Sequence, residues 1–264
     1  MGWLEALILG LLQGLTEFLP VSSSGHLELG KYIMDLSSAD SLQFTVLVHG
    51  ATVLSTIVVF YKDILRLFGA LFRFKWDADT QYIVKIIVSM IPVGIVGLFF
   101  KDYVESFFDG NIIFVGCMLL VTAMLLYFTY YAKTNDKEVG FKSAFIIGVS
   151  QAMAVLPGIS RSGSTIATGL LLGVKREEMA RFSFLMVLVP IIGANLKDLA
   201  DMPIGEISFS ASMPMVVGFI TAFVSGLAAC KLMINLVNRG KLVYFAIYCT
   251  IIGLVAIAVG LFAV

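Results

Sequence analysis

Apolar residues occur along this chain in long runs that short polar segments separate. The runs lie near residues 42–60, 82–100, 111–131, 179–197, 214–236 and 242–263. A helix needs about 20 predominantly apolar residues to cross the hydrocarbon core of a bilayer, and each run comes close to that length. The pattern therefore predicts six transmembrane helices.

Two further apolar segments, 1–34 and 143–173, are interrupted near their middle. The interruptions contain Pro20 and Pro157, and a helix cannot run on through either residue, because proline lacks an N–H group and clashes with the preceding turn. Serines that follow each proline offer N-caps for a new helix. Each segment is therefore predicted to form a re-entrant hairpin of two short helices.

The two halves of the chain match when one is shifted by 138 residues, which brings Gly10 onto Gly148. The other matching positions are Gln13 with Gln151, Ser24 and Gly25 with Ser162 and Gly163, and Phe44 with Phe182. Because each half contains three spans, the second half enters the membrane from the opposite side. The two hairpins should then meet tip to tip near the midplane.

The predicted fold class is an all-α integral membrane protein with six transmembrane helices plus two re-entrant helical hairpins, arranged as an inverted-topology repeat. Residues 1–264 are predicted to form a single polytopic membrane domain, with repeat one at about 1–131 and repeat two at about 143–264. The composition agrees, because 59% of the residues are hydrophobic and only 14% are charged, which excludes a water-soluble domain of this length.

The positions of the charged residues along the chain indicate how it is oriented in the membrane. With 18 basic and 18 acidic residues the chain has no net charge, and no nucleic-acid partner is expected. Lys and Arg gather in alternate links, at 62–75, 133–142, 175–181 and 239–241, whereas the remaining links carry mainly acids. Because basic links stay in the cytoplasm, the first hairpin and both termini are predicted to face outside.

The first hairpin holds ionisable side chains inside apolar surroundings. Glu17 and His26 lie within the stretch 13–26, and an ionisable group in such a position is costly and usually functional. Gln13 and Glu17 are four residues apart, which places them on the same helix face. Glu17 could bind Mg²⁺ or Ca²⁺, because these hard cations prefer oxygen ligands.

The second hairpin supplies a cation and a dense group of hydroxyls. Arg161 is the single Lys or Arg between Lys142 and Lys175, and its planar fork matches two oxygens of a phosphate group. The hydroxyls around it belong to Ser160, Ser162, Ser164 and Thr165. Together with the N–H groups at the half-helix starts, they predict a phosphate site. The alternative is a purely structural ion pair between Arg161 and Glu17.

The motifs of both hairpins resemble those of the bacterial undecaprenyl pyrophosphate phosphatases, a family also known for bacitracin resistance. The residues that carry the resemblance are Gln13 to Glu17, LPVSSSGH at 19–26, PGISRSGST at 157–165, FSFL at 182–185 and GFITAFVSGL at 218–227. The resemblance implies an enzyme of the bacterial inner (plasma) membrane that hydrolyses undecaprenyl diphosphate to undecaprenyl phosphate at the outer face, with a divalent cation. Many members have a second Glu where this chain has Gln13, which puts in doubt any role that needs two carboxylates on the metal.

The spacing of the first motif favours Ser23 as the nucleophile, because His26 lies three residues later on the same helix face and could act as general base and acid. Ser22 could take the place of Ser23, and direct attack by metal-bound water is the other alternative. The predicted catalytic residues are Glu17, Ser23, His26 and Arg161, with Glu17 as the metal ligand. The predicted substrate-binding residues are Gln13, Ser22, Ser24, Gly25, Ser160, Arg161, Ser162, Gly163 and Thr165.

Two other classes of protein remain open. A transporter or flippase of an anionic lipid would use the same inverted repeat and the same arginine without cutting the headgroup. The other superfamily of membrane lipid phosphatases needs a further histidine well downstream, whereas this chain has only His26 and His49. The expected partners are a polyisoprenyl diphosphate lipid substrate and membrane lipids, and a homodimer is left open.

Overall fold

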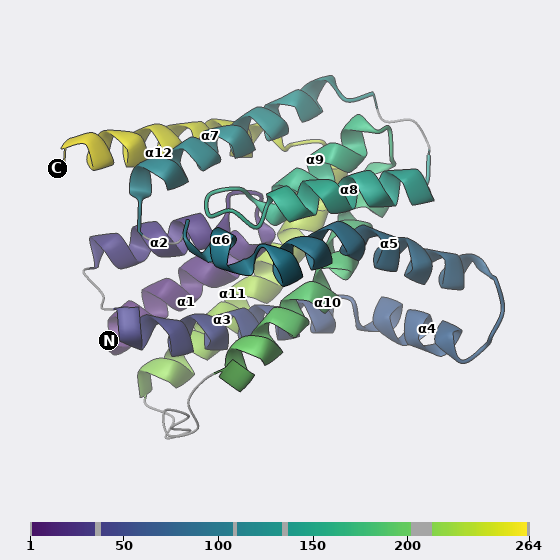
Figure 1. Cartoon of the computed structure of the whole chain (residues 1–264), viewed down its shortest axis with the longest axis horizontal. Coiled ribbons are helices and arrows are strands. Elements are labelled where there is room, and N and C mark those ends of the chain that lie inside the picture. The colour runs from purple at the N-terminus through teal and green to yellow at the C-terminus, as the bar shows by residue number, and fades with distance from the viewer. Residues whose placement is uncertain (1, 35–37, 108–109, 134–136, 202–212, 263–264) are drawn as a thin grey trace.

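Helices form the regular structure, and the described part of the chain contains no β-strand. The computed structural model describes residues 2–34, 38–107, 110–133, 137–201 and 213–262. In chain order the elements are α1 (Trp3–Phe18), α2 (Ser23–Ile33), α3 (Ser38–Val59), α4 (Tyr61–Leu71), α5 (Ala78–Phe99), α6 (Lys101–Glu105), α7 (Ile112–Phe128), the 3-10 helix η1 (Thr129–Tyr131), α8 (Phe141–Met153), α9 (Arg161–Leu171), α10 (Arg176–Asp201), α11 (Met213–Asn238) and α12 (Val243–Phe262). They form one bundle, in which α7 and α12 cover one side (Figure 1).

Five of the described helices are long and apolar enough to cross a membrane. They are α5, α7 together with η1, α10, α11 and α12. A sixth span results if α3 and α4 are counted together, although the chain bends by 79° between them. The five spans lie where the apolar runs predict them, and α3 covers the remaining run at 42–60, so the chain is an all-α integral membrane protein.

Both predicted interruptions are present, and each separates two short helices. The first break lies between α1 and α2 and contains Pro20, and the second lies between α8 and α9 and contains Pro157. The four helices have 16, 11, 13 and 11 residues. At about 1.5 Å per residue, none of them could cross a hydrocarbon core of about 30 Å alone.

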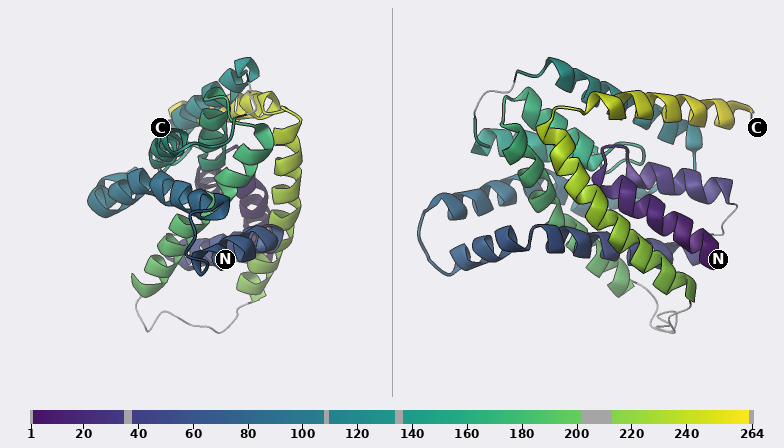
Figure 2. Two further views of the ribbon diagram at one scale, coloured as in Figure 1. Left: turned by 90° about the vertical axis from the view of Figure 1, so that its right-hand side faces the viewer. Right: turned by 180° about the vertical axis from the view of Figure 1, so that it is seen from behind.

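Helices from opposite halves of the chain pack in matching pairs. α1 lies along α11, α8 lies along α5, and α7 and α12 pack against each other (Figure 1, Figure 2). Exchanging the two halves would turn the first of these pairs into the second, since α1 corresponds to α8 and α11 to α5. The pairing therefore supports the predicted inverted repeat.

Glycines allow α1 and α11 to approach closely. A Cβ atom on Gly10 would lie 2.5 Å from the carbonyl oxygen of Gly218 and 3.0 Å from its Cα atom. A Cβ atom on Gly14 would lie 2.5 Å from the carbonyl oxygen of Ala222. Neither position of α1 could carry a side chain unless a helix moved, as is usual where membrane helices meet through small residues.

Gly10→Ala is expected to destabilise the protein, because the added methyl group meets backbone atoms that cannot rotate away. The expected cost is about 1–3 kcal/mol, measured as a lower melting temperature (Tm) in detergent. Gly94→Ala on α5 is the control, because nothing lies within 4 Å of a Cβ atom at that position. An unchanged Tm in the Gly10→Ala protein would show that α1 and α11 do not pack this closely.

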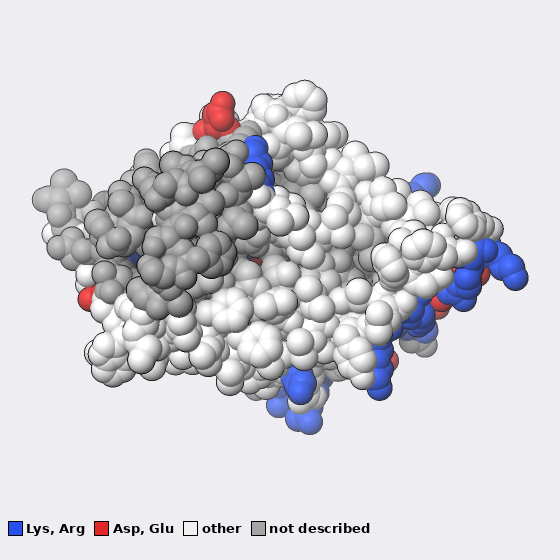
Figure 3. Space-filling view, turned by 90° about the horizontal axis from the view of Figure 1, so that it is seen from below, with Lys and Arg blue, Asp and Glu red and all other residues white. Residues whose placement is uncertain are grey.

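Lys and Arg side chains gather toward one end of the molecule, beside a broad uncharged surface (Figure 3). The link between α4 and α5 reaches this end (Figure 1). Here Arg73 bonds to Asp79 at 2.7 Å, and Arg66 lies 3.3 Å from the same carboxylate. This distribution is typical of a protein that spans a bilayer with its basic links on one side.

Candidate functional site

The tips of the two hairpins lie in contact with each other. A Cβ atom on Gly25, in the first turn of α2, would lie 3.1 Å from the Cα atom of Gly158 in the second break. A Cβ atom on Gly163, in the first turn of α9, would lie 3.1 Å from the Cβ atom of Pro20. Each tip thus needs a glycine where the other tip presses against it, and the positive ends of two helix dipoles come together here.

Serine side chains hold both tips in the same way. Ser22 caps α2 by accepting a hydrogen bond from Gly25 N at 3.3 Å, and Ser160 caps α9 by accepting one from Gly163 N at 3.1 Å. Ser22 has a φ of 69°, in the left-handed region that serine rarely adopts and that is enriched at functional sites. Both hydroxyls therefore shape the backbone of the tips.

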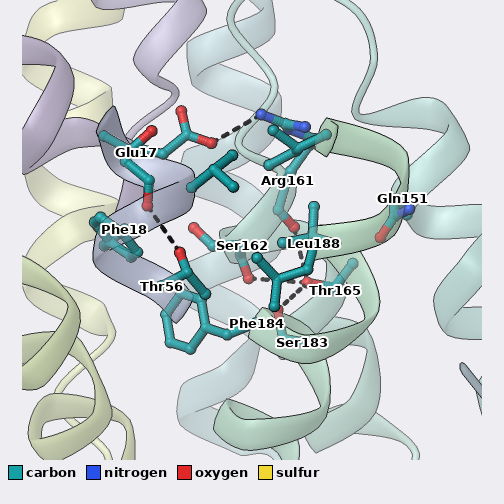
Figure 4. Close-up of a pocket in the computed structure, with 14 residues that line it drawn as sticks. Glu17, Phe18, Thr56, Gln151, Arg161, Ser162, Thr165, Ser183, Phe184 and Leu188 are labelled. Carbon is teal, nitrogen blue, oxygen red and sulfur yellow. Dashed lines mark hydrogen bonds and ion pairs between the residues drawn. The ribbon is translucent and has the colours of Figure 1, made fainter. Parts of the chain in front are cut away.

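Glu17 accepts hydrogen bonds from both tips. Its Oε1 atom accepts from Arg161 Nη2 at 2.9 Å (Figure 4), and its Oε2 atom accepts from Ser23 Oγ at 2.6 Å. Gln13 Nε2 also donates to Oε2, at 3.0 Å, which confirms that these two residues share a helix face. His49 Nε2 lies 3.9 Å from the same oxygen. The carboxylate is 9% exposed, and a cation and two neutral donors compensate its burial.

Arg161 forms the ion pair with Glu17 that the structural alternative predicts, but the pair does not exhaust its donors. Its side chain is 30% exposed, and the bond to Glu17 uses one of five N–H groups. Within the described part of the chain no other hydrogen bond from this guanidinium is formed. It can therefore hold Glu17 and still offer N–H groups to a phosphate.

His26 does not hydrogen-bond to Ser23 in this structure, although the sequence favours it as the base for that serine. Its Nδ1 atom lies 2.8 Å from the carbonyl oxygen of Ser22, and its Nε2 atom lies 2.8 Å from the hydroxyl of Tyr248 on α12. Because a carbonyl oxygen can only accept, Nδ1 carries the proton, and in the neutral ring Nε2 accepts from Tyr248. Ser23 and His26 are close enough in sequence to meet, but Glu17 and the Ser22 carbonyl are the acceptors that they reach. Nothing in the sequence singled out Tyr248.

Two further hydroxyls that the sequence did not single out support the second tip. Thr122 on α7 accepts a hydrogen bond from Ser160 N and donates one to Gly158 O, each at 3.0 Å. Ser183 on α10 shares a hydrogen bond of 2.6 Å with Thr165. The one signal in the sequence is a hydroxyl inside an apolar span, which commonly bonds to a neighbouring helix. The Thr165 hydroxyl, predicted to bind substrate, thus already holds α9 to α10.

The remaining predicted serines also lie at the tips. Ser24 Oγ is 3.4 Å from Ser22 Oγ, and Ser162 Oγ is 3.3 Å from Ser160 Oγ. Ser162 also reaches the carbonyl oxygen of Leu19 at 3.5 Å, which links the two hairpins. These contacts are long for hydrogen bonds between oxygens, so the hydroxyls of Ser24 and Ser162 can turn to a better acceptor.

A pocket lies beside the tips, between α1, α3, α8, α9 and α10 (Figure 4). Of the predicted site residues, its wall contains Glu17, Arg161, Ser162 and Thr165. Its other walls are largely apolar and include Phe184 and Leu188 of α10, whereas Ser23 and His26 lie outside the lining. The pocket thus combines a charged end with apolar walls, and its cavity volume is about 20 Å³.

The described residues contain no group of three or more His, Cys, Asp or Glu side chains that could hold a metal ion. The site does offer oxygen ligands, since Glu17 is joined by the Ser23 hydroxyl and by Gln13 Oε1, a buried atom without a hydrogen-bond partner. One carboxylate with neutral oxygens fits Mg²⁺ or Ca²⁺ when substrate phosphates and water complete the shell. The residues therefore fit a cation that binds together with the substrate.

Fold and site together define a polytopic helical membrane protein whose polar centre forms where two broken-helix hairpins meet. The family model described as Bacitracin resistance protein BacA matches residues 6–255. The chain belongs to this family.

Relatives match the chain over nearly its whole length. The undecaprenyl-diphosphatase of Bacteroides fragilis is 57% identical over 263 residues, which is 98% of each chain. That of Parabacteroides distasonis is 57% identical over 262 residues, with the same coverage. A more distant relative of the same name, from Methanosphaera stadtmanae, is 40% identical over 272 residues and covers 96% of each chain.

Proposed function

We propose that the protein is a membrane phosphatase that hydrolyses undecaprenyl diphosphate to undecaprenyl phosphate and inorganic phosphate. Relatives with the name undecaprenyl-diphosphatase support this activity. The observation that carries it is the convergence of Ser23 and Arg161, from opposite hairpins, on the carboxylate of Glu17. The Ser23 hydroxyl, the carboxylate that can accept its proton and the guanidinium that can bind phosphate are thereby held at one point. The reaction would recycle the lipid carrier for cell-wall synthesis and confer bacitracin resistance.

The geometry supports Ser23 as the nucleophile and Glu17 as its proton acceptor. The Ser23 hydroxyl donates to Glu17 at 2.6 Å, so its proton has an acceptor as the oxygen attacks. Attack on the terminal phosphorus forms a Ser23 phosphoester and breaks the bond to the bridging oxygen, which leaves with undecaprenyl phosphate. Water then attacks the same phosphorus and the bond to Ser23 Oγ breaks. The proton on Glu17 returns to Oγ, and inorganic phosphate leaves with the protons of the water.

Other residues of the site counter the charge of the diphosphate. Arg161 and the two helix starts offer N–H groups to its oxygens, and such groups stabilise charge best when they are held in place before the reaction. A divalent cation, held by Glu17 and the Gln13 side-chain oxygen, would supply further positive charge when bound. For His26 we propose that it positions the first tip, because its ring bonds to the carbonyl oxygen of Ser22 and to the hydroxyl of Tyr248.

Phosphate release from farnesyl diphosphate or undecaprenyl diphosphate by the purified protein in detergent tests the proposed function. We expect turnover that requires added Mg²⁺ or Ca²⁺ and that a chelator stops. A transporter or flippase with the same site would bind the diphosphate and release no phosphate. A folded preparation that binds diphosphate without releasing phosphate would therefore favour the transport class.

We also propose that the first hairpin and both termini face the outside of the plasma membrane. The ends of the chain lie opposite the end where the basic side chains gather (Figure 1, Figure 3). The positive-inside rule assigns the basic end to the cytoplasm. The site would then be open to lipid diphosphates of the outer leaflet.

Thiol labelling in intact cells tests this orientation, in a chain whose own cysteines are replaced by alanine. Ile33→Cys, at the exposed end of α2, is expected to react with an impermeant reagent in intact cells. Lys75→Cys, in the exposed link between α4 and α5, is expected to react only after lysis. The opposite pattern would overturn the proposed orientation.

A further inference from the structure

Gln151, near the end of α8, is a buried amide without hydrogen bonds. It is 1% exposed, and neither its Nε2 nor its Oε1 atom has a partner. It lines the pocket that Glu17 and Arg161 also line, and Figure 4 shows it on the far side of the pocket from Glu17. Because buried polar groups are normally bonded, an orphaned amide on the wall of a pocket points to a ligand.

The other neutral polar side chains of the pocket have partners within the protein, which for Ser162 are the long contacts to Ser160 and to the Leu19 carbonyl oxygen. Thr52 and Thr56 donate to carbonyl oxygens of their own helix, at 2.8 and 3.0 Å. Thr165 and Ser183 bond to each other. Among the described residues of the lining, Gln151 is therefore the polar side chain that makes no hydrogen bond within the protein.

The proposed inverted repeat explains why this amide is free. Gln151 matches Gln13 when the halves are shifted by 138 residues, and the Gln13 amide donates to Glu17. The position that matches Glu17 under the same shift is Val155, which offers no acceptor. The second hairpin thus keeps the amide and lacks the carboxylate.

We propose that Gln151 donates a hydrogen bond to a phosphoryl oxygen of the lipid diphosphate, on the pocket wall across from Glu17. This inference rests on the proposed phosphatase function and adds a binding residue to that site. A neutral amide carries two N–H donors, so it can bind anionic oxygens without drawing Glu17 away from Arg161. Because the amide gives up no internal hydrogen bond, only the phosphoryl oxygen loses partners, which are water molecules, when the new bond forms.

Gln151→Leu tests the proposal, because it removes the donors and keeps the side chain buried and of similar size. KM for farnesyl diphosphate is expected to rise roughly tenfold or more, as for loss of a hydrogen bond to a charged group. Tm in detergent is expected to stay the same or to rise, since an unsatisfied buried amide is removed as well. A glutamine that served packing alone would give the reverse, a lower Tm with an unchanged KM.

Thr129→Val is the matched control. Thr129 is another buried polar residue, but its hydroxyl donates to Leu126 O at 2.6 Å and it does not line the pocket. This variant should leave KM unchanged even if Tm falls. A rise in KM in both variants would mean that general loosening of the fold, not a lost contact, weakens substrate binding.

Direct binding separates the remaining outcomes. Ser23→Ala protein, which should not turn over, is titrated with farnesyl diphosphate with and without Gln151→Leu, and we expect about tenfold weaker binding or more in the double variant. Equal affinity of the single and the double variant would overturn the proposal. A fall in kcat at constant KM in the Gln151→Leu protein would also overturn it, because Gln151 would then act on the attacking water and not on substrate binding. If the wild type releases no phosphate, the proposed function fails, but the binding comparison still decides the role of Gln151.

Discussion

Ser23→Ala is expected to lower kcat for undecaprenyl diphosphate by roughly 10³-fold or more, with little change in KM. The Ser23 hydroxyl lies 2.6 Å from Glu17, and no backbone amide depends on it as a cap. Its loss should therefore remove the attacking oxygen and leave binding by Arg161 and the apolar walls intact. Phosphate release in detergent measures kcat and KM, and an unchanged Tm would show that the variant folds.

Ser22→Ala separates the two candidate serines. Ser22 is 3% exposed and its hydroxyl caps α2, so its loss should appear first as a fall in stability of about 0.5–2 kcal/mol. Any loss of kcat should be smaller than in Ser23→Ala. If Ser22→Ala lost turnover without losing stability while Ser23→Ala remained active, the nucleophile would be Ser22.

Glu17→Gln tests whether Ser23 and Glu17 act as a unit. If the carboxylate takes the proton of Ser23, each single variant should lose nearly as much activity as the Ser23→Ala/Glu17→Gln double variant. Substantial turnover in Ser23→Ala, together with loss in Glu17→Gln, would instead favour direct attack by a water molecule that Glu17 activates.

Arg161→Lys is expected to lower kcat/KM by roughly 10²-fold, although the positive charge is kept. The ammonium group of lysine cannot grip two phosphate oxygens and hold Glu17 at the same time, whereas the guanidinium fork can. Lysine is more informative here than alanine, because alanine would leave Glu17 buried without its cation, at an expected cost of about 3–5 kcal/mol of stability. The measurement is phosphate release over a range of substrate concentrations.

Arg73→Lys is the control for the same exchange. Arg73 is 46% exposed and bonds to Asp79 at the molecular surface, where an ion pair contributes about 1 kcal/mol at most. Its activity should equal that of the wild type. If Arg161→Lys also kept nearly full turnover, Arg161 would serve only to balance the charge of Glu17.

The broken-helix plan of this protein could be predicted from the sequence because its causes are local. Pro20 and Pro157 disfavour continuation of the helix before them and serines that follow them cap the next helix, whereas Pro92 and Pro190 lie inside α5 and α10 without such a serine cluster. The length of an apolar run decides whether a helix can cross a bilayer. The spacing of four residues between Gln13 and Glu17 likewise implied their contact, and the two side chains are hydrogen-bonded at 3.0 Å. These features depend on residues that are close in sequence, so they can be predicted without the positions of distant helices.

By itself, the sequence determined the class of protein, the two breaks and the residue types that meet there. Only the tertiary structure decided which of these residues pair. Arg161 reaches Glu17 across 144 residues of sequence, a pair that the sequence offered as one alternative. Tyr248 reaches His26 across 222 residues, and no local pattern could decide either pairing. The same holds for Ser23, whose hydroxyl donates to Glu17 and not to His26 three residues away. A hydrogen bond forms with the best acceptor within reach, and the packing of distant helices sets which acceptors those are.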